Sequence, residues 1–139
     1  MIAIIDSGGA NITSVKFALE RLGAASVLTD DINIISAADK VLLPGVGAAP
    51  VAMQRLSQPG LVECIRRLEQ PVLGICLGMQ LMFSFSAEGN TPLLGLFDAT
   101  CSAFKPTSQR SVPHMGWNRL VFQKDHPLLA GVENGAHVY

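Results

Sequence analysis

One stretch decides how the rest of the chain is arranged: Pro71-Val72-Leu73-Gly74-Ile75-Cys76-Leu77-Gly78-Met79-Gln80. Residues 71–75 form a short apolar run, which is typical of a strand buried on both faces of a sheet. After Cys76, apolar residues recur every four positions through Leu81 and Phe85, which predicts a helix. Cys76 therefore lies on a turn from strand to helix. Its sulfur is expected near the free N–H groups and positive dipole end of that helix, which favour the thiolate of a nucleophile.

Size and composition narrow the classes of function. The 139 residues fit a single domain, expected over residues 1–139. A formal net charge of −1 and a charged fraction of 15% give no basic surplus, so we expect a small neutral substrate and no nucleic acid. The most apolar stretch, residues 72–85, contains two glycines and a glutamine and is too short to span a bilayer. We therefore expect a buried sheet and no membrane partner.

The N-terminus and the cysteines indicate the compartment. Residues 1–6 lack the basic segment and the cleavage site of a signal peptide, so we expect a cytoplasmic protein. The three cysteines, Cys64, Cys76 and Cys101, are irregularly spaced and have no C-x-x-C or paired-histidine pattern. We expect no disulfide, no metal and no other cofactor.

Strand-like and helix-like patterns alternate up to residue 85. We expect strands at residues 2–5, 25–28 and 40–43, helices at 12–22, 48–56 and 60–68, and one helical turn at 33–38. This alternation predicts an α/β fold with a mostly parallel sheet and helices on both faces. Beyond residue 90, short strand-like pieces predict a β-rich elaboration of the same domain. Ligands of such sheets bind at the carboxyl ends of the strands.

The loop Asp6-Ser7-Gly8-Gly9-Ala10-Asn11 follows the first strand and is rich in turn residues. Asn11 is suited to cap the next helix, and Gly23 is suited to end it. Because Gly8-Gly9 lacks the spacing of the common nucleotide-binding loops, we interpret it as a tight turn, with a phosphate site as the alternative.

Two glycine turns follow predicted strands: Pro44-Gly45-Val46-Gly47 and the turn around Cys76. If the two strands are neighbours, N–H groups of the first turn can face the Cys76 sulfur and, with the N–H of Leu77, form an oxyanion hole. Gln80 lies one helical turn beyond Cys76, where its amide can bind a substrate held over the sulfur. The pattern indicates acyl transfer through a thioester. A buried structural thiol remains the alternative for Cys76.

These motifs resemble those of the class I, triad-type glutamine amidotransferases. Further similarity to the HisH-type glutaminase subunits of imidazole glycerol phosphate synthase lies in residues 5–15, in Leu43-Pro44-Gly45-Val46-Gly47 and in Val112-Pro113-His114-Met115-Gly116-Trp117-Asn118. The resemblance runs over essentially the whole chain. It implies the amidotransferase fold and a place in histidine biosynthesis.

The resemblance also implies roles for individual residues. Cys76 attacks the side-chain amide of glutamine, releasing ammonia and then glutamate. Gln80 contacts the glutamine, and Glu88 matches the acidic residue that holds its amino group. Gly47 and Leu77 supply the oxyanion-hole amides. Without the resemblance, Glu88 is interpreted as a solvated loop acid.

A partner is implied as well. Trp117 and Asn118 match family positions at the face docked on the cyclase/synthase subunit, a (β/α)₈ barrel. That subunit receives the ammonia and makes imidazole glycerol phosphate and AICAR.

One departure concerns the triad, because the family's His-x-Glu segment matches no part of these 139 residues. The sequence His126-Pro127-Leu128 lacks the acid, and we interpret His114 and His137 as structural or substrate-loop residues. We therefore expect the chain to be C-terminally incomplete, without the last strands and helix of the fold. Alone, it should be nearly inactive, because the acid and base roles each contribute about 10²–10⁴-fold. It should also be unstable or associate.

Two other functions remain open. The chain can be a catalytically silent interaction module that docks on the barrel partner. It can also be a different cysteine-dependent hydrolase on a similar sheet.

Overall fold

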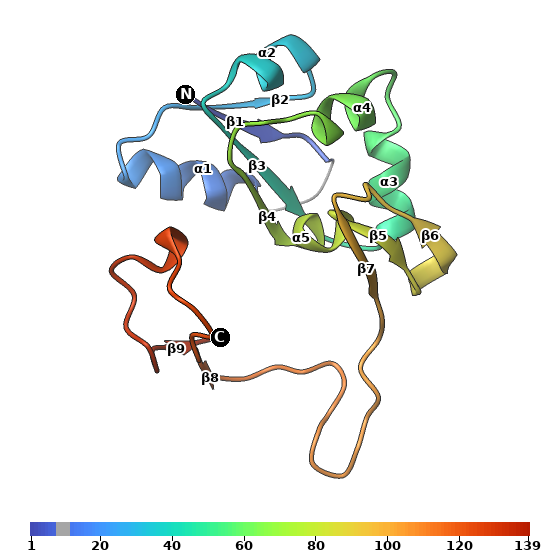
Figure 1. Ribbon diagram of the computed structural model, residues 1–139, viewed down its shortest axis with the longest axis vertical. Coiled ribbons are helices and arrows are strands. Elements are labelled where there is room, and N and C mark those ends of the chain that lie inside the picture. The colour runs from blue at the N-terminus through green and yellow to red at the C-terminus, as the bar shows by residue number, and fades with distance from the viewer. Residues whose placement is uncertain (8–11) are drawn as a thin grey trace. The chain divides into compact units, whose positions relative to one another are not determined.

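The computed structural model describes residues 1–7 and 12–139 (Figure 1). The chain divides into two compact units, Met1–Ala103 and Phe104–Tyr139. The interpretations of Gly8-Gly9 and Asn11 lie outside the described residues. The expectation of one domain over residues 1–139 stays a prediction.

The first unit is built on a four-stranded parallel sheet. Its strands lie in the order β2 (Ser26–Thr29), β1 (Ile2–Ile5), β3 (Lys40–Gly45) and β4 (Val72–Cys76). All three strand pairs are parallel. The register sets Gly45 opposite Cys76, so the two glycine turns leave the same edge of the sheet from neighbouring strands. The predicted parallel α/β sheet is confirmed.

Helices cover both faces of this sheet, as expected. They are α1 (Ile12–Arg21), α2 (Ile32–Ala37), α3 (Ala49–Leu56), α4 (Leu61–Arg66) and α5 (Leu77–Leu81). Crossovers between parallel strands are right-handed, so the face that a helix covers depends on the direction in which the chain moves across the sheet. The chain moves one way from β1 to β2 and the opposite way from β2 to β3 and on to β4, so α1 lies on one face and the helices of the later connections lie on the other. Figure 1 shows α1 on one side of the sheet and α2, α3 and α4 on the other.

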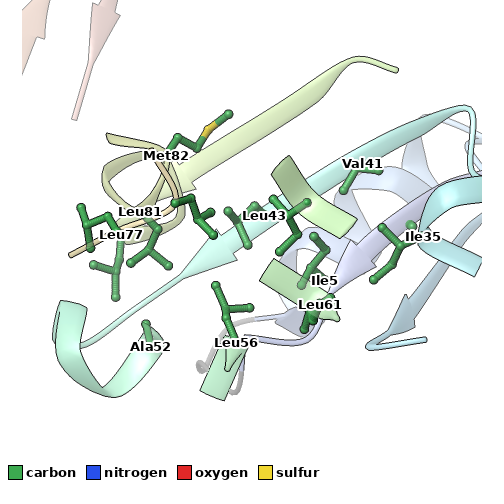
Figure 2. Packing of buried hydrophobic residues seen from close by; sticks show 14 of the residues in the cluster. Ile5, Ile35, Val41, Leu43, Ala52, Leu56, Leu61, Leu77, Leu81 and Met82 are labelled. Atoms are coloured by element: carbon green, nitrogen blue, oxygen red, sulfur yellow. The ribbon is translucent and has the colours of Figure 1, made fainter. Parts of the chain in front are cut away.

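The core lies on the face covered by α2, α3 and α4. Alternate residues of β1 and β3 point into it, as the two-residue period of a strand requires. Figure 2 shows these strand side chains meeting those of the helices. The cluster includes Ala3, Ile5, Ile35, Val41, Leu43, Ala52, Leu56, Leu61, Ile65, Leu77 and Leu81.

Local signals explain where α1 ends. Gly23 has φ +68°, its N–H donates to the carbonyl of Glu20, and the next N–H, of Ala24, donates to that of Leu19. A glycine in the left-handed region accepts this conformation without a Cβ clash. The predicted stop at Gly23 is confirmed.

The helix after Cys76 is shorter than predicted. It ends at Leu81, and Phe83–Ser86 is strand β5, so the assignment of Phe85 to a helix was wrong. Residues 83–86 alternate apolar and polar side chains, which suits a strand. β5 lies between β6 (Thr91–Pro92) and β7 (Phe97–Cys101) in a second sheet, which agrees with the β-rich elaboration.

β4 was predicted to be buried on both faces, which is wrong for part of the strand. Leu73 and Ile75 are 39% and 38% exposed. In the described part of the chain β4 pairs only with β3, so it is an edge strand. β3 itself runs on to Gly45, two residues beyond its predicted end.

The second unit, residues 104–139, has little regular structure. Strands β8 (Asn118–Arg119) and β9 (His137–Val138) pair antiparallel, and a short 3₁₀ helix, η2 (Pro127–Leu129), lies between them in sequence. Each of these strands spans only two residues. No helix in the described residues is long and apolar enough to cross a membrane.

Candidate active site

Cys76 sits on a strained turn between β4 and α5. Its φ of 55° and ψ of −121° lie where side chains are rarely found, and among the described non-glycine residues only Asn90 shares a positive φ. Such strain costs about 1–3 kcal/mol and persists where the surrounding structure enforces it. A strand-to-helix turn of this kind presents a nucleophile at the top of the sheet. Cys76 is exposed, which argues against the buried structural thiol.

Glycines beside Cys76 allow this turn to pack directly on β3. A Cβ at Gly78 would lie 1.8 Å from the carbonyl oxygen of Leu43, so only glycine fits there. A Cβ at Gly45 would lie 2.7 Å from the backbone nitrogen of Gly78. The backbones of the two glycine turns are therefore in contact, which the sequence spacing alone did not show.

The residues predicted for the oxyanion hole lie at this same edge. Gly47 follows β3 with φ +92°, and Leu77 is the first residue of α5, where N–H groups lack helical partners. The buried hydroxyl of Ser7 donates to the carbonyl oxygen of Pro44 at 2.7 Å, which fixes the start of the glycine turn. Both residues thus follow neighbouring strands at one edge of the sheet, and their assignment to an oxyanion hole stays a prediction.

A cavity of about 400 Å³ brings together the two predicted glutamine contacts, Gln80 and Glu88. Its volume lies within the range of small-molecule sites. The other lining residues come from β5, β7 and the segments after them: Ser86, Ala87, Cys101, Ser102 and Ala103. Cys76 is not part of this lining and lies one helical turn before Gln80.

Glu88 is held in this cavity by three hydrogen bonds. It begins the 3₁₀ helix η1 (Glu88–Asn90). Its backbone N–H donates to the hydroxyl of Ser86 at 3.1 Å, and its carbonyl accepts from the hydroxyl of Thr91 at 2.8 Å. Its carboxylate Oε2 accepts from the backbone N–H of Ala49, the first residue of α3, at 2.8 Å.

Sequence reasoning missed Ser86 and Thr91, because small polar residues beside a turn carry no distinctive signal. Both are buried, at 5% and 8% exposure. Buried hydroxyls are normally hydrogen-bonded, and these two fix the backbone of Glu88.

Cys101 is the thiol that lines this cavity. Burial raises the pKa of the Cys101 thiol above its usual value. Its Sγ lies 3.7 Å from the carbonyl oxygen of Gln80. Cys101 is therefore held as a neutral thiol, a poor nucleophile.

The histidines all belong to residues 104–139. The Nε2 of His114 lies 2.8 Å from the Nδ2 of Asn118, and the Nδ1 of His126 accepts from the backbone N–H of Leu128 at 3.1 Å. His137 is part of β9. Residues 1–103 thus contain Cys76 but no imidazole.

The predicted partner face also lies in the second unit. Trp117 is 70% exposed and meets the ring of Tyr139 edge-on, with 5.6 Å between the ring centroids. Asn118 also donates to the carbonyl of Gly116 at 3.2 Å. An exposed tryptophan suits a protein interface, and this role stays a prediction.

Known proteins match the chain along nearly its whole length. The family model for "Glutamine amidotransferase class-I" matches residues 3–139. The chain belongs to the class I glutamine amidotransferase family. The predicted family and fold of this amidotransferase are thereby confirmed.

Among curated relatives, the "Imidazole glycerol phosphate synthase subunit HisH" of Xylella fastidiosa is 50% identical over 138 residues, 99% of this chain and 69% of the relative. The protein of that name from Mannheimia succiniciproducens is 49% identical over 136 residues, 98% and 70% of the two chains. The one from Haemophilus influenzae is 51% identical over 138 residues, 99% and 69%.

A solved structure described as "Crystal structure of glutamine amidotransferase" has the same fold, with a TM-score of 0.62 and 17% identity. The match covers 73% of this amidotransferase and 56% of that chain.

Proposed function

We propose that this protein is the glutaminase subunit of an imidazole glycerol phosphate synthase. It hydrolyses glutamine to glutamate and ammonia at Cys76. The ammonia passes to a cyclase/synthase subunit, a (β/α)₈ barrel that makes imidazole glycerol phosphate and AICAR in histidine biosynthesis. The two subunits form a heterodimer in the cytoplasm. Identity near 50% to HisH subunits supports the assignment, and the strained, exposed Cys76 is the structural observation that carries it.

The chemistry follows from the positions of these groups. The Cys76 thiolate attacks the side-chain carbonyl carbon of glutamine, and the N–H groups of Gly47 and Leu77 stabilise the oxyanion. The carbon–nitrogen bond then breaks, ammonia leaves with an added proton, and a thioester remains. Water attacks the thioester, which releases glutamate and the thiol. Gln80 and Glu88 hold the substrate in the cavity that both residues line.

The two proton transfers require an acid–base group. None of His114, His126 and His137 stands in a His-x-Glu pattern. We therefore propose that the 139-residue polypeptide alone hydrolyses glutamine about 10²-fold or more slower than a subunit with a complete triad does.

This same observation favours a second candidate, a silent module that only docks on the barrel. The exposed Trp117 supplies its contact. In both cases Trp117→Ala should weaken barrel binding by about 30-fold, while Val121→Ala, at an equally exposed position, should have little effect. Glutaminase activity of the natural protein with its barrel partner separates the two, since only the enzyme releases ammonia.

Labelling tests the nucleophile directly. A glutamine-like diazoketone should add to Cys76 alone, and peptide mass spectrometry locates the adduct. Modification at Cys64 or Cys101 in preference to Cys76 would contradict the assignment.

A further inference from the structure

Helix α3 begins without a cap of its own. Ala48, at the N-cap position, makes no side-chain hydrogen bond, and Pro50 has no N–H to satisfy. The N–H of Ala49 instead donates to Oε2 of Glu88, which lies 39 residues further along the chain. A carboxylate at a helix N-terminus is favoured by the helix dipole and forms a charge-assisted hydrogen bond. Glu88 therefore supplies the cap that α3 lacks.

The segment that carries Glu88 is fitted to the start of α3. Gly89 has φ +65°, and a Cβ there would lie 2.5 Å from Cγ of Pro50. The hydroxyls of Ser86 and Thr91 hold the backbone of Glu88 from either side. The carboxylate is thus placed by the surrounding structure.

The helix that Glu88 caps follows the glycine turn directly. Only Ala48 separates Gly47 from Ala49. Ser7 fixes the beginning of this turn through the carbonyl of Pro44, and Glu88 fixes Ala49, two residues beyond its end. The amide assigned to the oxyanion hole, that of Gly47, lies between these two fixed points.

We propose that Glu88 is a positioning residue for the oxyanion turn as well as a contact for the substrate. One carboxylate oxygen holds Ala49, and the other is left to take the α-ammonium group of glutamine in the cavity that Glu88 lines. Filling the cavity therefore fixes the same carboxylate that fixes the turn. This inference rests on the proposed glutaminase function and goes beyond it, because substrate binding and oxyanion stabilisation then share one group.

A substrate without the amino group separates the two roles. Glutaramate is glutamine without its α-amino group, so it has no ammonium for Glu88 to hold. If Glu88 only binds the ammonium, its removal affects glutamine alone. If Glu88 also positions the turn, its removal slows glutaramate hydrolysis too.

The experiment compares Glu88→Gln, Glu88→Ala and the control Glu69→Gln in the natural protein with its synthase partner, by kcat and KM for both amides. In Glu88→Gln the new side chain has no charge to hold the ammonium group of the substrate, so the KM for glutamine should rise by about 10- to 100-fold. The amide oxygen of the new side chain can still accept from the N–H of Ala49, so glutaramate turnover should stay within about 3-fold of wild type. Glu88→Ala should also lower kcat for glutaramate by about 10-fold, as expected for a lost cap. Glu69→Gln, an exposed acid after α4, should match wild type.

Wild-type turnover of glutaramate by Glu88→Ala would overturn the inference. Backbone amide hydrogen exchange in residues 46–51 gives a readout that needs no activity. It should quicken in Glu88→Ala and stay near wild type in Glu88→Gln, and unchanged exchange in Glu88→Ala would likewise overturn the inference. If wild-type protein hydrolyses neither amide, the proposed function fails, and the exchange rates alone decide the role of Glu88.

Discussion

Replacing Cys76 by glycine should make the protein more stable while abolishing its chemistry. Cys76 has φ 55° and ψ −121°, a conformation that glycine adopts freely and other residues do not. Cys76→Ala is the matched control, because it removes the sulfur but keeps the Cβ that causes the strain. The pair therefore isolates the backbone strain from the loss of the thiol.

The magnitude follows from two opposing effects. Relief of a strained backbone conformation contributes about 1–3 kcal/mol. Glycine also destabilises the folded protein by about 0.5–1 kcal/mol, because it increases the conformational entropy of the unfolded chain. Because Cys76 is exposed, little buried surface is lost in either variant. Cys76→Gly should thus be more stable than Cys76→Ala by roughly 1 kcal/mol, within limits of about 0 and 2.5 kcal/mol.

Equilibrium unfolding in urea, with both variants prepared and measured under identical conditions, gives this difference in the free energy of unfolding. The m-values should agree, so that the midpoints report stability alone. If Cys76→Gly is less stable than Cys76→Ala, the turn at Cys76 is not strained, and the structural argument for a nucleophile fails.

Three further outcomes are expected. Gly78→Ala should cost about 3 kcal/mol in urea unfolding, because its Cβ would overlap a carbonyl oxygen of β3, and a wild-type midpoint would contradict that packing. Burial raises the pKa of the Cys101 thiol, so a limiting amount of iodoacetamide near pH 8 should modify the exposed Cys76 first. The difference between the two alkylation rates should narrow as the pH rises, and preferential alkylation of Cys101 would refute this. The 139-residue polypeptide alone should associate in sedimentation because Leu73 and Ile75 are exposed on an edge strand, whereas a clean monomer that unfolds cooperatively would show otherwise.

Much of the first unit could be predicted from the chain, because its patterns are local. The alternation of apolar runs and helical periods places the strands of the parallel sheet. The turns at Gly45 and Cys76 were expected on one edge, and the register brings them opposite each other. Because crossovers between parallel strands are right-handed, such an alternation of strands and helices is compatible with only a few sheet topologies.

The failures have physical causes. Phe85 fits both a four-residue and a two-residue repeat, and the pairing of β5 with β6 and β7 decides between them. The exposure of Leu73 depends on which strands flank β4, which the period of a single strand does not reveal.

The cap that Glu88 gives to Ala49 was also beyond sequence reasoning. It joins residues 39 apart, and an acidic residue in a turn looks the same whether or not it meets a helix end. The family resemblance implied that Glu88 is a substrate contact, while only the fold shows that it also accepts from Ala49.

Cys76 performs glutamine hydrolysis in the proposed mechanism, so the loss of its thiol should abolish ammonia release. Ammonia release from glutamine is followed for the natural protein with its barrel partner, using Cys76→Ala, Cys64→Ala and Cys101→Ala in parallel. Cys76→Ala should lose activity by about 10³-fold or more, while the other two variants should stay close to wild type. Glutamine hydrolysis by Cys76→Ala at the wild-type rate would contradict the proposed mechanism.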